Sequence, residues 1–229
     1  MGKGLIISDL HIPCEHKHAL TFCKEIYAKE KCDWALQIGD LVDWHSISFH
    51  PKEPGMPNPT EEFKIALGKV KQWHKAFPKL KILLGNHSNR PQRLAKSVNI
   101  PDQLIKAYND AWQTPGWEWA EEFFIDGVQY LHGEGFGGIY PAANACRSIG
   151  LSVVTGHAHA CAMIWWYANK LRRTFGMTVG SLIDDNSLAF AYAANTARKS
   201  IISVGTVENG MNPQLHLMPL NKGEKYGKR

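Results

Sequence analysis

Short apolar runs alternate with helical stripes over the first half of the chain. The candidate strands are residues 5–8, 34–38 and 80–84, which are brief and strongly apolar. Residues 19–31 place apolar side chains on one helical face. Residues 60–74 do the same, and we expect Thr60 to be the N-cap of that helix. Strand, helix, strand, helix, strand is the order expected of parallel strands joined by helical crossovers.

The second half of the chain is richer in predicted strands. Residues 122–125 and 128–131 flank Asp126-Gly127, a dipeptide suited to a tight hairpin turn. A helix is expected at residues 140–149. The remaining candidate strands are residues 152–155, 162–167, 173–179, 200–207 and 214–218. These strands predict a second sheet packed on the first.

Residues 49–59 interrupt the pattern with four prolines and a glycine, so we expect an irregular, exposed loop there. The loop follows closely on Asp40 and could form a flap over a site at that place. His45 and His50 are close to the same cluster and could line the cleft. Loop histidines, however, are more often simply solvated.

Composition narrows the class of protein. The chain has 229 residues, of which 44% are hydrophobic and 21% charged, and it contains no linker-like stretch. We therefore expect one compact domain over residues 1–220, followed by a basic, flexible tail at residues 221–229. No apolar run approaches the roughly 20 residues that a membrane helix needs, and the start resembles no cleavable leader. Five cysteines without a C-x-x-C pair favour a reducing cytoplasm over a disulfide framework.

The net charge of +5 and the pI near 8.9 are compatible with an anionic substrate such as nucleic acid. Part of this excess is in the tail, so charge alone decides little. Five tryptophans could stack on bases, although packing in the core is the more common role of such residues. These residues are Trp112, Trp117, Trp119, Trp165 and Trp166.

Polar clusters follow the predicted strands. They are Asp9-Leu10-His11, Gly39-Asp40-Leu41-Val42-Asp43, Gly85-Asn86-His87, His132 and Gly156-His157-Ala158-His159. Taken singly, each could be an ordinary turn or cap. In open α/β sheets, however, ligands bind beyond the carboxyl ends of parallel strands, so the clusters are expected to meet. Their imidazoles, carboxylates and amide suit a pair of divalent metal ions.

The clusters, in this order, resemble the motifs of the calcineurin-like metallophosphoesterase superfamily: D-x-H, G-D-x-x-D/E, G-N-H-D/E, a lone His and G-H-x-H. The resemblance covers Asp9 to His159 for the motifs. It implies a single α/β domain with two mixed β-sheets flanked by helices, a four-layer α-β-β-α sandwich.

The resemblance also implies a set of metal ligands. One metal ion would be held by Asp9, His11, Asp40 and His159, and the other by Asp40, Asn86, His132 and His157. Asp40 would bridge the two ions. Manganese is the favoured metal, with iron, zinc, nickel or magnesium as alternatives. In this family pattern a metal-bridging hydroxide attacks phosphorus.

Two further residues receive catalytic roles from the resemblance. His87 would protonate the leaving group, and Asp43 would orient His87 by a hydrogen bond. A helix N-cap is the alternative for Asp43. Arg90 and His45 are candidate substrate-binding residues; Arg90, with Arg93, could equally be the solvated start of a helix.

Two departures from the family pattern bear on function. Trp44 stands where the protein phosphatases of the superfamily have a phosphate-binding arginine, which counts against a phosphoprotein phosphatase. Ser88 replaces the usual acidic residue, which raises the question of what supports the loop that carries His87. The expected function is a phosphodiesterase acting on a nucleotide or nucleic acid. The alternatives are a phosphomonoesterase and a non-catalytic or partner-dependent nucleic-acid-binding protein.

Overall fold

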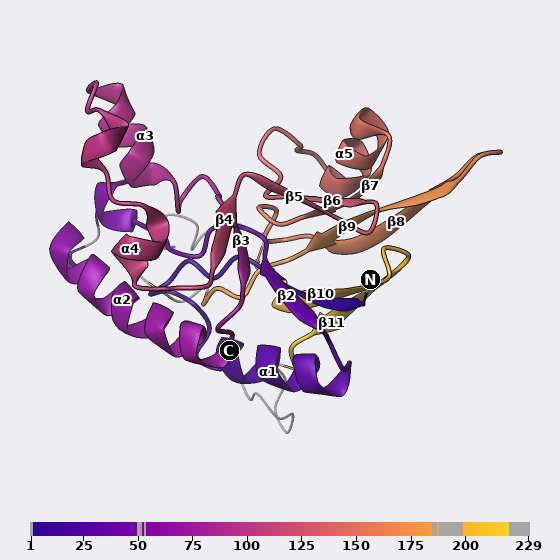
Figure 1. The fold of residues 1–229 in the computed structure, drawn as a ribbon, viewed down its shortest axis with the longest axis horizontal. Coiled ribbons are helices and arrows are strands. Elements are labelled where there is room, and N and C mark those ends of the chain that lie inside the picture. The colour runs from indigo at the N-terminus through magenta and orange to yellow at the C-terminus, as the bar shows by residue number, and fades with distance from the viewer. Residues whose placement is uncertain (1, 50–51, 53, 185–186, 188–198, 220–229) are drawn as a thin grey trace.

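Two β-sheets form the centre of the computed structural model, which describes residues 2–49, 52, 54–184, 187 and 199–219 (Figure 1). The six-stranded sheet has the order β11-β10-β1-β2-β3-β4, and the five-stranded sheet has the order β5-β6-β7-β9-β8. The strands of the first sheet are β1 Lys3–Ile7, β2 Trp34–Gln37, β3 Lys81–Leu83, β4 Glu118–Ala120, β10 Ser203–Glu208 and β11 Asn212–Leu217. Those of the second are β5 Glu122–Ile125, β6 Val128–Leu131, β7 Ser152–Thr155, β8 Ala162–Ala168 and β9 Arg173–Val179.

The first sheet is parallel from β1 to β4, as the strand and helix order predicted, while β10 and β11 join it antiparallel. Side chains alternate between its faces. In β1, Leu5 and Ile7 point to the core beneath the helices, and Ile6 points to the core between the sheets. Strand β4 was not predicted, because three residues carry too little pattern.

Helices α1 (Ala19–Lys29) and α2 (Pro59–Ala76) cover the outer face of the first sheet. The expected N-cap of α2 was wrong, because Asn58 takes that place. Its side-chain oxygen accepts the backbone N–H groups of Thr60 and Glu61 at 3.0 Å, and Glu61 bonds back to the Asn58 N–H. Pro59, at the first helical position, loses no hydrogen bond there. The irregular segment therefore ends one residue earlier than expected.

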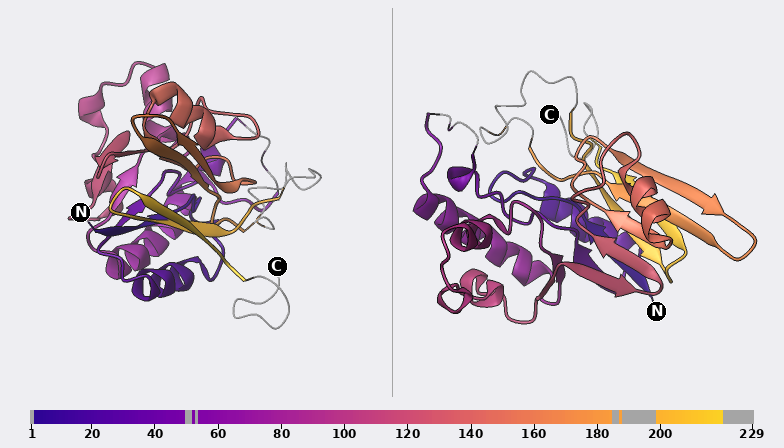
Figure 2. Two further views of the ribbon diagram at one scale, coloured as in Figure 1. Left: turned by 90° about the vertical axis from the view of Figure 1, so that its right-hand side faces the viewer. Right: turned by 90° about the horizontal axis from the view of Figure 1, so that it is seen from above.

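The second sheet is also mixed. Strands β6, β7 and β9 are parallel, and β5 and β8 are antiparallel edge strands. The β5–β6 hairpin turns at Asp126 and Gly127, both with positive φ, as predicted. Helix α5 (Pro141–Ile149) packs on the outer face through Ala145 and Cys146. The order of layers is helices, sheet, sheet, helix, which confirms the four-layer sandwich (Figures 1 and 2).

The segment between β3 and β4 contains two short helices that hydrophobic pattern alone did not define. They are α3 (Arg90–Ser97) and α4 (Tyr108–Trp112); α4 contacts α2, and α3 lies above α4 in Figure 1. Among the described residues, no helix is both long and apolar enough to span a membrane. His50 and the predicted tail at residues 221–229 lie outside the described residues, and the flap over the site stays a prediction.

Candidate metal centre

The ends of five strands meet at one edge of the sandwich. Asp9 follows β1, Asp40 follows β2 and Asn86 follows β3 in the first sheet, while His132 follows β6 and His157 follows β7 in the second. The carboxyl ends of these parallel strands lie at the same edge, so residues far apart in sequence converge. The predicted meeting of the polar clusters is observed.

One group of ligand atoms comprises Asp9, His11 and His159, whose candidate donor atoms lie within 4.8 Å of one another. The Nε2 atom of His159 is 3.1 Å from Asp9 Oδ2 and 3.2 Å from His11 Nε2. Asp9 and His11 are fully buried. Two imidazole nitrogens this close to a carboxylate oxygen form a donor set suited to a divalent cation.

A second group comprises Asp40, His132 and His157, also within 4.8 Å. Asn86 adjoins it, because its Oδ1 atom is 3.1 Å from His132 Nε2. Asp40 Oδ2 is 3.1 Å from His132 Nε2 and 3.6 Å from His11 Nε2. One carboxylate oxygen thus lies between imidazoles of both groups.

The two oxygens of Asp40 have different surroundings. Oδ1 accepts the backbone N–H of His87 at 2.7 Å and that of Ser88 at 3.4 Å. Oδ2 faces the imidazoles. Burial alone would raise the pKa of Asp40, but the neighbouring imidazoles, first His132, hold it well below its usual range. The carboxylate is therefore ionised and presents one oxygen to the centre.

Ser88, at the usual acidic position, is buried, and its hydroxyl oxygen accepts the Val42 N–H at 3.3 Å. Together with its backbone bond to Asp40, this ties the loop after β3 to the loop after β2. The serine thus supplies local support for the loop that carries His87.

Hydrogen bonds orient two of the imidazoles. His11 donates from Nδ1 to Asp43 Oδ1 at 2.7 Å, and His132 donates from Nδ1 to the Ile38 carbonyl at 3.1 Å. A proton on Nδ1 leaves the Nε2 lone pair directed into the centre. The sequence did not indicate the hydrogen bond from His11 to Asp43, because motif spacing does not show which imidazole a carboxylate will contact.

Asp43 also bonds to His87, whose Nδ1 lies 2.8 Å from the same Asp43 oxygen. The His87 side chain is 18% exposed. Burial lowers the pKa of His87, but the Asp43 hydrogen bond and the Asp40 charge raise it above 6.5 overall. Asp43 is not a helix cap; Trp44 precedes the short 3-10 helix His45–Ile47. The geometry is the one expected for an oriented imidazole.

The two candidate substrate-binding residues differ. Arg90 is half-buried beside His87, and its Nη1 donates to the carbonyls of Asp43 at 3.0 Å and Trp44 at 2.8 Å. His45 is buried, with Nδ1 3.9 Å from Asp43 Oδ2 and no hydrogen-bond partner for Nε2 among the described residues. His45 is thus close to the centre but is not a solvated loop residue.

Glu62 also lies near the site, although the sequence did not indicate it. It is buried on α2 and accepts the backbone N–H groups of His45 and Ser46, each at 2.9 Å. Beside it, Trp44 stacks on Phe63 with 6.1 Å between the ring centroids. Glutamate early in a helix is so ordinary that no sequence signal distinguished it.

Three observations indicate that the residues of this site fit a pair of cations. Asp9 Oδ1 is buried and has no hydrogen-bond partner among the described residues. A Cβ on Gly156 would lie 2.4 Å from that oxygen, and one on Gly85 would lie 2.2 Å from Asp40 Oδ1, so both glycines leave room for the carboxylates. His11, Asp40 and His157 have φ of 49°, 50° and 63°. Non-glycine residues in this strained left-handed conformation cluster at functional sites.

Comparisons with known proteins rest on structure, because no protein-family model and no curated protein matches the sequence. The fold matches vacuolar protein sorting 29 from Cryptosporidium parvum with a TM-score of 0.51 and 16% identity, covering 97% of this chain and 94% of that one.

Two other solved structures match less well. A metallophosphoesterase from Sphaerobacter thermophilus has a TM-score of 0.48 and 15% identity, covering 95% and 88% of the two chains. Nuclease MPE from Pseudomonas putida has a TM-score of 0.44 and 14% identity, covering 94% and 87%. Taken with the two mixed sheets and their flanking helices, the stronger match shows that this chain has the calcineurin-like fold.

Proposed function

We propose that the protein is a phosphodiesterase that depends on two divalent metal ions and acts on a nucleotide or a nucleic acid. The observation that carries this proposal is the position of Asp40 Oδ2, which lies between His11 Nε2 and His132 Nε2. A carboxylate oxygen shared by two donor groups is the arrangement needed to bridge two cations.

We assign the ligands of the two ions as the motifs imply, and these distances support the assignment. Asp9, His11, Asp40 and His159 would hold one ion, and Asp40, Asn86, His132 and His157 the other. When bound, such a pair activates water for attack at phosphorus and neutralises charge on the phosphoryl oxygens. Imidazole, carboxylate and amide donors favour manganese, with iron, zinc, nickel and magnesium as alternatives.

His87 would protonate the leaving oxygen of the ester. Its Nδ1 is held by Asp43, and its raised pKa favours the doubly protonated ring. In that ring Nδ1–H donates to the carboxylate and Nε2–H remains to donate to the substrate. Asp43 acts through His87 and is a positioning residue in this scheme.

Arg90 would contact a phosphate group. Backbone carbonyls hold its guanidinium beside His87, and among the described residues no carboxylate forms an ion pair with it. Its charge therefore remains able to attract an anion. The mildly basic chain and the absence of the protein-phosphatase arginine at Trp44 support a nucleotide or nucleic acid diester over a phosphoprotein.

A second candidate is a binding protein of the same fold without turnover. The match that supports it is to a protein named for vacuolar sorting rather than for a reaction. Against it, all seven candidate ligands and His87 are present and converge at one edge. A phosphomonoesterase of the same fold is the third candidate.

The test begins with metal-free protein supplied separately with manganese, magnesium and zinc. Hydrolysis of bis(p-nitrophenyl) phosphate is compared with that of p-nitrophenyl phosphate, using Asp40→Ala as the control. Faster metal-dependent cleavage of the diester supports the proposal, and preference for the monoester supports the phosphomonoesterase. Metal binding with no cleavage above the control, on these esters and on oligonucleotides, would leave only the binding protein.

A further inference from the structure

The β8–β9 hairpin projects from the second sheet beyond the body of the molecule (Figures 1 and 2). Strand β8 begins at Ala162, three residues after His159 of the metal centre, and ends at Ala168. At about 3.3 Å per residue the strand carries the chain some 20 Å outward. The Asn169 side chain accepts the backbone N–H groups of Leu171 and Arg172 and closes the turn. The hairpin is thus an ordered arm that leads away from the centre.

Aromatic side chains occupy both faces of β8. Trp165 and Tyr167 share one face, stacked at 8° with their centroids 5.9 Å apart. Trp166 is on the other face, 5.5 Å from Phe175, with the Arg173 guanidinium 4.8 Å from its ring. Trp166 is 44% exposed and Tyr167 48%. Rings held in this way and partly open to solvent present flat surfaces to a ligand.

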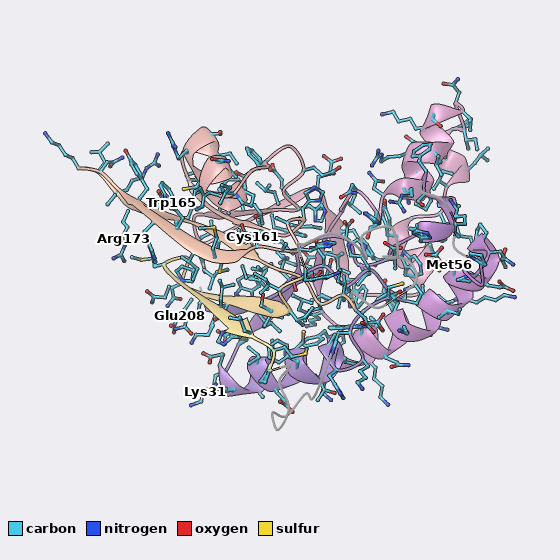
Figure 3. The ribbon with its side chains drawn as sticks, turned by 180° about the vertical axis from the view of Figure 1, so that it is seen from behind. Lys31, Met56, Cys161, Trp165, Arg173 and Glu208 are labelled. Carbon is cyan, nitrogen blue, oxygen red and sulfur yellow. The ribbon has the colours of Figure 1, made fainter. Side chains whose placement is uncertain are left out.

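The charge of the arm is entirely positive. Residues 162–179 include Lys170, Arg172 and Arg173 and no Asp or Glu. Among the described residues, no carboxylate forms an ion pair with any of the three. Figure 3 shows Trp165 and Arg173 on this arm, on the side of the molecule away from Met56. The arm therefore favours an anionic ligand.

A hollow lies on each face of the arm. One, of about 340 Å³, is lined by Arg147 of α5 together with Trp165, Tyr167 and Arg172. The other, of about 380 Å³, is lined by Trp166, Arg172 and Arg173 together with Met211. Each hollow thus combines an aromatic ring with an arginine.

We propose that the β8–β9 hairpin binds single-stranded nucleic acid, with a base stacking on Tyr167 and with Arg172 and Arg173 contacting phosphates. Unpaired bases expose the faces that stack on aromatic rings, whereas a duplex buries them. The inference deepens the proposed function and rests on it for the fate of the bound strand, which would run along β8 towards the metal centre. A second copy of this chain pairing with the β8 edge is the competing occupant.

The test measures binding without cleavage. Fluorescence anisotropy follows a labelled oligothymidylate of about 16 nucleotides added to metal-free Asp40→Ala protein over a series of salt concentrations. Tyr167→Ala should weaken binding about 5- to 100-fold, whereas Tyr167→Phe, which keeps the ring, should stay within about twofold. The same oligonucleotide annealed to its complement should bind with no dependence on Tyr167.

Charge is tested separately. Replacing Arg172 and Arg173 together by alanine should reduce the slope of log K against log salt by about 1.4, the value for two phosphate contacts on a single strand. The matched control removes two exposed lysines from α2, Lys64→Ala with Lys71→Ala, and should leave binding within about twofold. Thermal unfolding of each variant establishes that it folds.

The outcomes separate the two proposals. Equal binding by wild type, Tyr167→Ala and the double arginine variant would overturn the inference, as would a concentration-dependent dimer lost on Tyr167→Ala with no oligonucleotide binding. Hydrolysis of bis(p-nitrophenyl) phosphate should be unchanged in the hairpin variants. Oligonucleotide binding without any diester hydrolysis would overturn the proposed function and leave the hairpin as a binding surface.

Discussion

The two ends of the first sheet differ in chemistry. Where β2, β3 and β4 begin, a hollow of about 800 Å³ opens between Trp34, Phe77, Lys81 and Glu118. Its lining is mainly apolar, and its Lys81 and Glu118 pair with each other. By volume alone it is well suited to a ligand.

The other end, where the same strands finish, has a concentration of buried polar atoms. Asp9, His11 and Asp40 are buried together, and Asp9 Oδ1 has no hydrogen-bond partner in the described part of the chain. Such an arrangement costs free energy unless a ligand compensates it. Buried polar groups that need a partner therefore indicate function here more strongly than the size of a hollow.

The sharpest test of this comparison removes one carboxylate from each end. Asp40→Ala should lower diester hydrolysis on the order of 10⁴-fold or more, because both metal groups lose their shared ligand and with it the activated water. The Glu118 side chain is 64% exposed, and Glu118→Ala should change the rate of hydrolysis less than twofold. Steady-state kinetics and metal analysis measure both; a comparable loss in the two variants would refute the comparison.

Substituting His87 tests the chemical step separately from metal binding. His87→Gln should lower kcat by about 10²- to 10⁴-fold, because the general acid is lost, while metal content stays unchanged. Metal analysis and kinetics on the same preparation give the answer. Loss of metal in step with activity would mean that His87 is a ligand rather than the acid.

Substituting Asp43 should lower both metal affinity and kcat. Asp43→Asn weakens the orientation of His11 as well as His87, so metal affinity should fall about 10- to 100-fold and kcat should fall even at saturating metal. Titration with metal followed by kinetics at saturation distinguishes the two effects. If excess metal restored the full kcat, Asp43 would act through His11 alone and not through His87.

Two glycine substitutions give the smallest effects, with opposite signs. Gly156→Ala places a Cβ 2.4 Å from Asp9 Oδ1 and should destabilise the protein by about 1 to 3 kcal/mol. Gly68→Ala, within α2, meets no atom within 4 Å and should stabilise it by about 0.5 to 1 kcal/mol. Urea denaturation measures both, and equal effects would remove the special role of Gly156.

The sequence predicted the elements with strong periodicity and the residues placed directly after them. β7 and β9 have the expected bounds, and the clusters containing Asp9 and Asp40 lie together because parallel strands end at one edge. β4 was missed because three residues provide no periodicity. The fold was accessible because its signals are local and repeated along the chain.

The contacts that were missed depend on tertiary packing. Asp43 was expected to meet His87, but its second bond to His11 joins residues 32 positions apart. The burial of His45 and the role of Glu62 likewise arise from the packing of α2 against the loop after β2. Motif spacing names the candidate groups, and packing decides which of them meet.

The donor atoms at the proposed centre come from both sheets, and the pair His11 and His159 lies 148 positions apart in the chain. Cations held there would act as cross-links that close a very long loop, in the manner of a disulfide. A metal at a thousand times its Kd would raise the free energy of unfolding by about 4 kcal/mol. The melting temperature would then report metal occupancy even in variants that have lost all catalysis.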